Sequence, residues 1–430
     1  MKLTTYFLSL LFIVQMSNAQ SKPEHNYDES KVPEFQVPDP LTTFNGAKVS
    51  NSSQWLEDRR PELYSFFEEN VYGKVPGKLD NISFEVIEHA DNALNGMATR
   101  KQIRVTATKN NRSLNFTILL YLPKGQSKAP VFLGHNFLGN HTVNKDSNII
   151  ITKAWVKNTK RLGITDNRAK ESSRGVRTNR WAIEKIIAKG FALATIYYGE
   201  IDPDKDVEDD LDKGDFTDGI HPLFYEEGQQ IPKANEWGSI AAWAWGLSRA
   251  LDYFETDSDI DATKVIAFGH SRLGKASLWA AATDQRFAAV ISNNSGCGGA
   301  ALSKRKFGET LGRINRVFPH WFSDSFNTYN NNEEALPIDQ HQLLSLIAPR
   351  PLYVASAIED RWSDPRGEFL SAHYATAVYN LFDKEGISSQ IMPEVDRPIQ
   401  HTVAYHIRTG KHDVTDYDWE QYIKWAKEQL

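Results

Sequence analysis

The serine at position 271 stands in a local sequence that suits nucleophilic catalysis. Residues 265–269 form an apolar run typical of a buried strand, and a helical pattern starts directly after Ser271 and continues to residue 282. A sharp turn between a strand and a helix exposes a serine hydroxyl at the carboxyl edge of a sheet, which is a nucleophile elbow. The common elbow has glycine two residues after the serine, whereas this chain has Leu273 there and Gly274 next. We therefore predict covalent catalysis by Ser271, with a chance Gly-x-Ser junction as the alternative.

A serine nucleophile needs a general base, and proteins with this elbow place the acid and the histidine after the serine in the chain. That order excludes six of the twelve histidines: His25, His89, His135, His141, His221 and His270. Three others lie in predicted connections or in a helix: His320, His341 and His373. His401 precedes the strand predicted at residues 403–408, and His406 lies inside it, where a side chain points into a packed face. His412 follows the carboxyl end of that strand, so we predict that His412 is the base and that His406 is structural.

Two carboxylates can complete the catalytic group, because both follow the strand predicted at residues 351–357. They are Glu359 and Asp360. Either can orient an imidazole and stabilise its charged form. We predict Asp360 as the acid and keep Glu359 in reserve, since spacing alone does not show which side chain turns inward. At least one of the two must be an ordinary solvated loop charge.

The elements that must position these residues alternate along the chain. A helical pattern over residues 55–72 precedes three β-rich stretches, at 82–89, 99–107 and 114–122, which predict an antiparallel start to a sheet. Further strands are predicted at 130–135, 191–198, 264–269, 287–293, 351–357 and 403–408, and helices at 180–189, 236–255, 272–282, 367–384 and 417–428. Strands that alternate with helices indicate an α/β fold with a mostly parallel sheet, covered by helices on both faces.

Two stretches, residues 137–179 and 200–235, are too long for simple connections, so we predict insertions above the carboxyl edge of the sheet. The second insertion is rich in acids: Glu200, Asp202, Asp204, Asp206, Glu208, Asp209, Asp210, Asp212 and Asp215. A twelve-residue calcium loop starting at Asp202 would place Val207 where glycine is required and Lys213 where the bidentate glutamate belongs. A solvated acidic loop is the better interpretation, and we predict neither a metal nor a cofactor.

The composition excludes several classes of protein. Hydrophobic residues make up 40% of the 430 residues and charged residues 24%, which argues against a disordered chain and a polytopic membrane protein. With 49 Lys+Arg against 55 Asp+Glu the chain has no basic excess, so nucleic acid is not an expected partner. The single cysteine, Cys297, cannot form an intramolecular disulfide, and stability must therefore come from packing.

The first nineteen residues have the pattern of a secretory signal peptide. Lys2 gives a basic start, residues 6–14 are apolar, and small residues precede a cleavage site near Ala19. The apolar run is about half of the ~20 residues that span a bilayer, so no membrane span is expected after cleavage. Residues 20–45 are polar and Pro-rich and predict an extended lead-in, followed by a single catalytic domain over residues 46–430. We expect a secreted or periplasmic protein.

Residues 269–275 read Gly-His-Ser-Arg-Leu-Gly-Lys, and further stretches accompany them: Asn293–Gly299, Phe307–Thr310, Phe318–Phe322 and Trp362. Together these segments resemble the bacterial glucuronoyl esterases of carbohydrate esterase family 15, over a region from about Trp55 to the C-terminus. The resemblance implies an α/β-hydrolase fold and a metal-free serine esterase. Its substrates would be glucuronoxylan and lignin-carbohydrate esters, cleaved between 4-O-methyl-glucuronic acid and a lignin alcohol.

The resemblance also implies roles for individual side chains. Arg272 resembles the oxyanion stabiliser, and its place after the serine also lets its backbone N–H serve an oxyanion. Lys275 and Trp362 resemble the uronate-binding residues of the family, and Glu309 resembles a residue that contacts sugar hydroxyls. Many members, especially fungal ones, carry the catalytic glutamate where this chain has Asn294. An asparagine cannot hold negative charge, so the acid must come from the later loop that other bacterial members use.

Two other function classes stay open from the sequence. An acetyl or feruloyl esterase acting on plant cell-wall polysaccharide would use the same serine machinery. A non-catalytic carbohydrate-binding protein with an inactive triad is the second alternative. Turnover of a panel of esters distinguishes all three.

Overall fold

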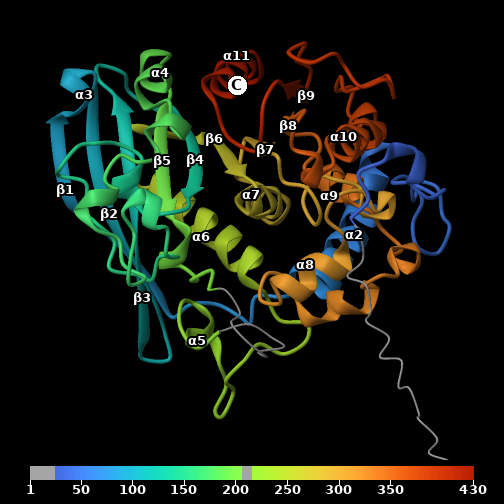
Figure 1. Cartoon of the computed structure of the whole chain (residues 1–430), viewed down its shortest axis with the longest axis horizontal. Helices are drawn as coiled ribbons and strands as arrows, with labels where there is room; N and C mark the ends of the chain where they lie inside the picture. Colours follow the sequence, from blue (N-terminus) through green and yellow to red (C-terminus); the bar gives the residue numbers. More distant parts are fainter. Residues whose placement is uncertain (1–24, 206–215) are drawn as a thin grey trace, which may run out of the picture.

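The computed structural model describes residues 25–205 and 216–430 (Figure 1). The predicted signal peptide and most of the acidic run lie outside these residues. Within the described part of the chain, no helix has the length and apolar character that crossing a membrane requires.

One nine-stranded sheet runs through the molecule, in the order β1-β2-β3-β5-β4-β6-β7-β8-β9. Its antiparallel part consists of β1 (Asn81–Asn92), β2 (Ala98–Lys109) and β3 (Arg112–Pro123). The parallel part consists of β4 (Ala129–Asn136), β5 (Ala192–Tyr197), β6 (Ile260–His270), β7 (Ala289–Asn293), β8 (Leu352–Ala357) and β9 (Val403–Arg408). β3 joins the two parts by antiparallel pairing with β5. The predicted antiparallel start and mostly parallel continuation are confirmed.

Helices cover both faces of this sheet (Figure 1). One hydrophobic cluster joins the sheet to α6 (Ser239–Phe254), α7 (Arg272–Thr283) and α10 (Pro365–Asn380), and the other joins it to α4 (Ile183–Ala188) and α11 (Asp416–Gln429). Along β6, Val265 and Ala267 belong to the first cluster, and Ile266 and Phe268 belong to the second. Burial on both faces explains why the central strands read as continuous apolar runs. The α/β-hydrolase fold expected from the sequence is confirmed.

The predicted long helices all form, with ends displaced by a few residues. The pattern over residues 55–72 becomes a continuous helical stretch made of α1 (Ser52–Gln54), α2 (Arg60–Phe67) and π-helical turns at Trp55–Arg59 and Glu68–Tyr72. The sequence did not predict four short helices: α3 (Ala93–Gly96), α5 (His221–Phe224), α8 (Leu311–Val317) and α9 (Gln340–Ser345). Two turns or fewer are too short to show a helical period.

Both predicted insertions start at the carboxyl ends of parallel strands. Residues 137–179 follow β4 and contain only short 3₁₀ turns, and residues 200–235 follow β5 and contain α5. Their position brings them to the edge of the sheet at which β6 presents Ser271. In α/β sheets this edge is where functional loops gather.

Candidate active site

Ser271 occupies a strained turn between β6 and α7. Its backbone angles are φ 59° and ψ −132°, in a region that residues with a Cβ rarely adopt. A Cβ at Gly269 would lie 1.9 Å from the carbonyl oxygen of Leu273, so only glycine lets the strand and helix approach this closely. At Gly274 a Cβ would lie 3.0 Å from the Cβ of Ser295. The glycine displaced by one position therefore makes room for the loop after β7.

His412 lies in the loop after β9 and contacts a carboxylate from the loop after β8. Its Nδ1 donates to Oδ2 of Asp360 at 2.6 Å, and Asn294 Nδ2 donates to the same oxygen at 2.7 Å. Burial raises the pKa of Asp360, but the hydrogen bonds from His412 and Asn294 outweigh it and lower the pKa overall. Asp360 is 6% exposed, whereas Glu359 is exposed. The structure brings Asp360, and not Glu359, to His412.

The elbow and His412 meet through the residue that precedes the serine. The rings of His270 and His412 have their centroids 4.4 Å apart. His270 is buried, its Nδ1 donates to Oδ1 of Asn293 at 2.6 Å, and burial lowers its pKa well below the ordinary value. His270 is therefore a neutral packing partner of His412. His406 is buried within β9 and bonded at both nitrogens, to Asp418 and to the hydroxyl of Tyr353, each at 2.9 Å.

Arg408 fixes the loop that carries His412. Its guanidinium donates to the carbonyl oxygens of Thr409, Lys411 and Asp413, at 3.0, 3.1 and 2.5 Å. The same group donates to the buried carboxylate of Asp418 at 2.8 Å. Since these three carbonyls flank His412 on both sides, the imidazole is held by its backbone as well as by Asp360.

Arg272, the first residue of α7, forms an ion pair with Asp204. The carboxylate of Asp204 also accepts from His320 Nε2 and Trp321 Nε1, both at 2.8 Å, and from the hydroxyl of Tyr198 at 2.9 Å. Burial alone would raise the pKa of Asp204, yet Arg272 and these donors hold it well below the ordinary carboxyl value. The guanidinium also lies 4.5 Å from the ring centroid of Trp321.

The expectation of a solvated acidic loop is therefore wrong for its described members. Glu200 accepts from the N–H of Thr117 at 2.8 Å, and burial raises its pKa to about 7. Asp204 is 4% exposed and Asp202 is 1% exposed. Asp206 to Asp215 lie outside the described residues. Composition hides the difference, because a buried acid is distinguished by partners far away in the chain, here Arg272 and the His320-Trp321 pair. The only local signal is that Asp204 follows the carboxyl end of β5, at the same sheet edge as Ser271.

Replacing Asp204 should cost both stability and activity. Breaking a buried ion pair by removing one partner typically costs about 3 kcal/mol, so we expect Asp204→Asn to lower the free energy of unfolding by about that amount. Since folding depresses the pKa of Asp204, this contribution is present at neutral pH and is lost only on acidification below its unfolded pKa of about 4. We also expect kcat/KM to fall roughly tenfold or more, because Arg272 loses its fixed orientation.

Urea denaturation of the two proteins measures this stability loss. Asp166→Asn is the matched control, because Asp166 pairs with Lys170 on the exposed surface and its loss should change little. Equal stability of Asp204→Asn and the wild type would show that the Asp204 cluster does not hold Arg272.

The three side chains expected to bind sugar lie near one another, with Glu309 close to both Lys275 and Trp362. Lys275 is 4% exposed, and its Nζ donates to the carbonyl oxygen of Ser295 at 2.5 Å. Burial lowers the pKa of Lys275, and nearby Glu309 opposes this effect. Burial raises the pKa of Glu309, which Lys275 and Arg272 counteract. The N–H of Glu309 donates to the carbonyl oxygen of Trp362 at 3.1 Å, which joins the loops that carry these two residues.

Among the described residues, no group of three or more His, Cys, Asp or Glu side chains is arranged to hold a metal ion. The polar atoms brought together here are instead a hydroxyl, an imidazole paired with a carboxylate, a guanidinium and an ammonium. Such a set can attack an ester, transfer a proton and stabilise an oxyanion.

Comparisons with known proteins agree with this chemistry. A family model described as glucuronyl esterase of fungi matches residues 219–383. A carbohydrate esterase of an unknown prokaryotic organism is 50% identical over 406 residues, which cover 94% of this chain and 92% of that protein. The 4-O-methyl-glucuronoyl methylesterase of Podospora anserina is 37% identical over 135 residues, which cover 29% of this chain and 28% of that protein.

Solved structures extend the similarity over the whole fold. A promiscuous esterase of carbohydrate esterase family 15, from a marine bacterial metagenome, superposes with a TM-score of 0.88 at 50% identity and covers 95% of this chain and 100% of its own. A glucuronoyl esterase from Solibacter usitatus gives a TM-score of 0.86 at 46% identity and covers 93% of this chain and 100% of its own. The chain is a carboxylic ester hydrolase and belongs to the glucuronoyl esterases of carbohydrate esterase family 15.

Proposed function

We propose that this protein is a 4-O-methyl-glucuronoyl esterase, which cleaves the ester between glucuronic acid side groups of xylan and lignin alcohols. The observation that carries the proposal is that two groups of residues, one suited to catalysis and one suited to sugar binding, lie at the same edge of the sheet. Ser271 stands in a strained turn, and the ring of its neighbour His270 lies 4.4 Å from that of His412, which pairs with Asp360. The buried Lys275 follows in the first turns of α7, and the partly buried acid Glu309 interacts with its charge. The first group suits ester cleavage, and the second suits the hydroxyl-rich acyl half of a uronate ester.

The mechanism follows from the residue types. Ser271 attacks the ester carbonyl while His412 accepts its proton, and Asp360 orients the imidazole and stabilises its charged form. Arg272 faces the tetrahedral oxyanion with its side chain and its backbone N–H, at the N-terminus of α7. When the intermediate collapses, His412 gives its proton to the leaving alcohol. Water then attacks the glucuronoyl-serine ester with His412 again as base, which releases the uronic acid and restores Ser271.

The scissile carboxyl belongs to the sugar, so the binding contacts should lie with the acyl half. Lys275 donates hydrogen bonds, Glu309 accepts them, and Trp362 offers a flat ring to the pyranose. The alcohol half can then remain open to solvent and to bulky aromatic groups. This division explains how one site would accept the varied alcohols of lignin.

Loss of a sugar contact should therefore weaken turnover whatever the alcohol is. We expect Lys275→Ala and Trp362→Ala each to lower kcat/KM for glucuronate esters by roughly tenfold or more, which corresponds to about 1.4 kcal/mol. Steady-state kinetics with a methyl and a benzyl glucuronate ester measure this for both variants. A loss confined to the benzyl ester would place the two residues on the alcohol side, and the proposed uronate pocket would have to be abandoned.

We also propose that residues 1–19 direct export and that the mature protein works outside the cytoplasm. The basic start, the apolar run and the small residues before Gln20 support this proposal, and so does the polymeric nature of the proposed substrate. The one sheet formed by the described residues supports a single catalytic domain over residues 46–430. N-terminal sequencing of the exported protein should give Gln20 as the first residue, and retention of Met1 would contradict the proposal.

A further inference from the structure

We propose that the N-terminal segment 25–31 is a wall of the sugar-binding side of the active site and positions Trp362 for recognition of the uronate. This inference rests on the proposed function and adds the segment to the proposed sugar-binding site. The segment belongs to the lead-in that precedes the predicted catalytic domain. Its described residues contact the two loops that carry Glu309 and Trp362.

The first loop, residues 305–309, holds the segment by an ion pair between a buried arginine and an exposed glutamate, and by a backbone hydrogen bond. Arg305 Nη2 lies 2.8 Å from Oε1 of Glu29, and Arg305 Nε lies 2.8 Å from Oδ2 of Asp364. The Arg305 side chain is only 4% exposed, so it depends on both carboxylates for compensation of its charge. The N–H of Gly308 donates to the carbonyl oxygen of Asn26 at 2.8 Å. Glu29 is thus the anchor of the segment.

The second loop, residues 361–364, meets the segment through aromatic rings. The ring of His25 stands edge-on to the indole of Trp362, with centroids 4.6 Å apart and an angle of 83° between the planes. The guanidinium of Arg361 lies 5.6 Å from the ring centroid of Tyr27. His25 therefore supports Trp362, the residue proposed to stack on the sugar.

The two loops and the segment form one packed unit. A Cβ at Gly308 would lie 2.4 Å from the carbonyl oxygen of Trp362 and 2.7 Å from that of Arg361. This close approach, together with the hydrogen bond between Glu309 and Trp362, fixes the two loops relative to each other. A change in the position of the segment must then change the positions of both proposed sugar contacts, Glu309 and Trp362.

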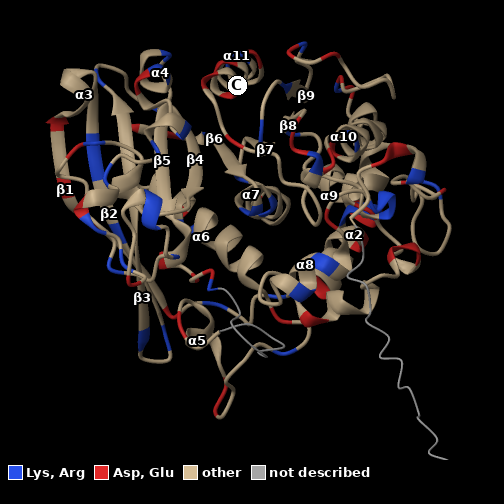
Figure 2. Cartoon of the chain, in the orientation of Figure 1, with Lys and Arg blue, Asp and Glu red and all other residues tan. Residues whose placement is uncertain are grey.

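The contact between His25 and Trp362 is one of packing and not of charge. Burial lowers the pKa of His25, and so do Arg313 and Arg316 of α8, which Figure 2 shows as a helix with basic residues. A neutral imidazole presents its edge to an indole as any aromatic ring does. Phenylalanine at position 25 should therefore support Trp362 as histidine does, whereas alanine should not.

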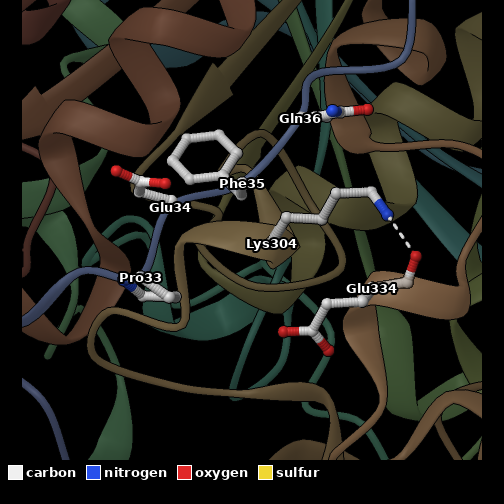
Figure 3. A pocket seen from close by; sticks show the side chains of 6 residues that line it. All are labelled: Pro33, Glu34, Phe35, Gln36, Lys304 and Glu334. Carbon is white, nitrogen blue, oxygen red and sulfur yellow. Dashed lines mark hydrogen bonds between the residues drawn. The ribbon is translucent and has the colours of Figure 1, made fainter.

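The chain that follows the segment packs Phe35 against the hydrophobic core. Residues 33–36 border a hollow of about 730 Å³, across from Lys304 and Glu334 (Figure 3). The ammonium of Lys304 donates to the backbone carbonyls of Glu333, Glu334 and Leu336. The contacts that hold the segment near Trp362 are therefore those of residues 25–31 themselves, above all the pair between Glu29 and Arg305.

Kinetics on the full exported chain test the inference. We expect His25→Ala and Glu29→Gln each to lower kcat/KM for methyl glucuronate ester about fivefold or more. The rate at which a small fluorophosphonate labels Ser271 should stay within twofold of the wild type, because that probe carries no sugar. His25→Phe should keep at least half of the wild-type kcat/KM. Glu34→Gln is the matched control, since it makes the same change five residues further along the chain, outside the segment, and should have no effect.

Three outcomes separate the possibilities. Wild-type kcat/KM in both His25→Ala and Glu29→Gln would overturn the inference and leave the proposed function intact. An equal fall in ester turnover and in fluorophosphonate labelling would also overturn it, because the segment would then act on the fold or on the triad. A wild-type protein that does not cleave glucuronate esters, but is labelled at Ser271, would overturn the proposed function itself and the inference with it.

Discussion

Ser271→Ala is expected to lower ester turnover by at least about 10⁴-fold, because the variant has no atom that can form the acyl intermediate. The thermal unfolding transition should stay close to that of the wild type. Alanine has the same Cβ as serine and bears the same strain at φ 59°. The loss is therefore chemical and not a consequence of unfolding.

Ser271→Gly provides the matched control for the strained turn. Glycine adopts positive φ without penalty, so this variant should be equally inactive but about 1 kcal/mol more stable than Ser271→Ala. Turnover of a glucuronate ester and urea denaturation measure the two effects. If a folded Ser271→Ala protein kept a tenth of the wild-type rate, the serine mechanism would have to be given up.

Asp360→Asn is expected to lower kcat by roughly 10⁴-fold, since an amide can neither fix the productive tautomer of His412 nor stabilise its charged form. Glu359→Gln should cost far less, because Glu359 is exposed and Asp360 Oδ2 is the atom 2.6 Å from His412 Nδ1. Steady-state kinetics on both variants give the ranking. The reverse ranking would move the assignment to Glu359, and two fully active variants would mean that the acid lies elsewhere.

Asn294 allows a test of whether the catalytic carboxylate can come from a different loop. Its Nδ2 lies 2.7 Å from the same oxygen of Asp360 that His412 contacts. Adding Asn294→Glu to the Asp360→Asn variant places a carboxylate beside the imidazole again and should recover part of the lost activity. Recovery would show that either loop can serve one histidine.

The features that the sequence predicted are those with a local cause. A buried parallel strand appears in the sequence as an apolar run. The nucleophile elbow can be predicted because β6, the turn and α7 occupy one short stretch of the chain. The order of Ser271 and His412 along the chain, combined with the position of each after a strand, then selects one histidine from twelve. The structure places that histidine next to the elbow through His270.

The features that the sequence did not predict depend on partners far away in the chain. Asp204 reads as one of many acids, and only the fold brings Arg272 to it. The sequence did not single out Glu368 of α10, yet this residue accepts from Ser356 Oγ and the N–H of Gly296, and burial raises its pKa to about 8. Residues 25–31 have no periodic pattern, so their contacts with Trp362 and Arg305 leave no trace in the local sequence.

Turnover of an ester panel by the purified protein tests the central claim most directly. The panel contains methyl and benzyl glucuronate esters, an acetylated sugar and a feruloylated sugar, with Ser271→Ala as the blank for each. The account predicts that glucuronate esters are cleaved with a kcat/KM at least about tenfold higher than the other two classes, a difference of about 1.4 kcal/mol in transition-state stabilisation. Preference for the acetyl or feruloyl ester, or no turnover of any ester above the blank, would contradict it.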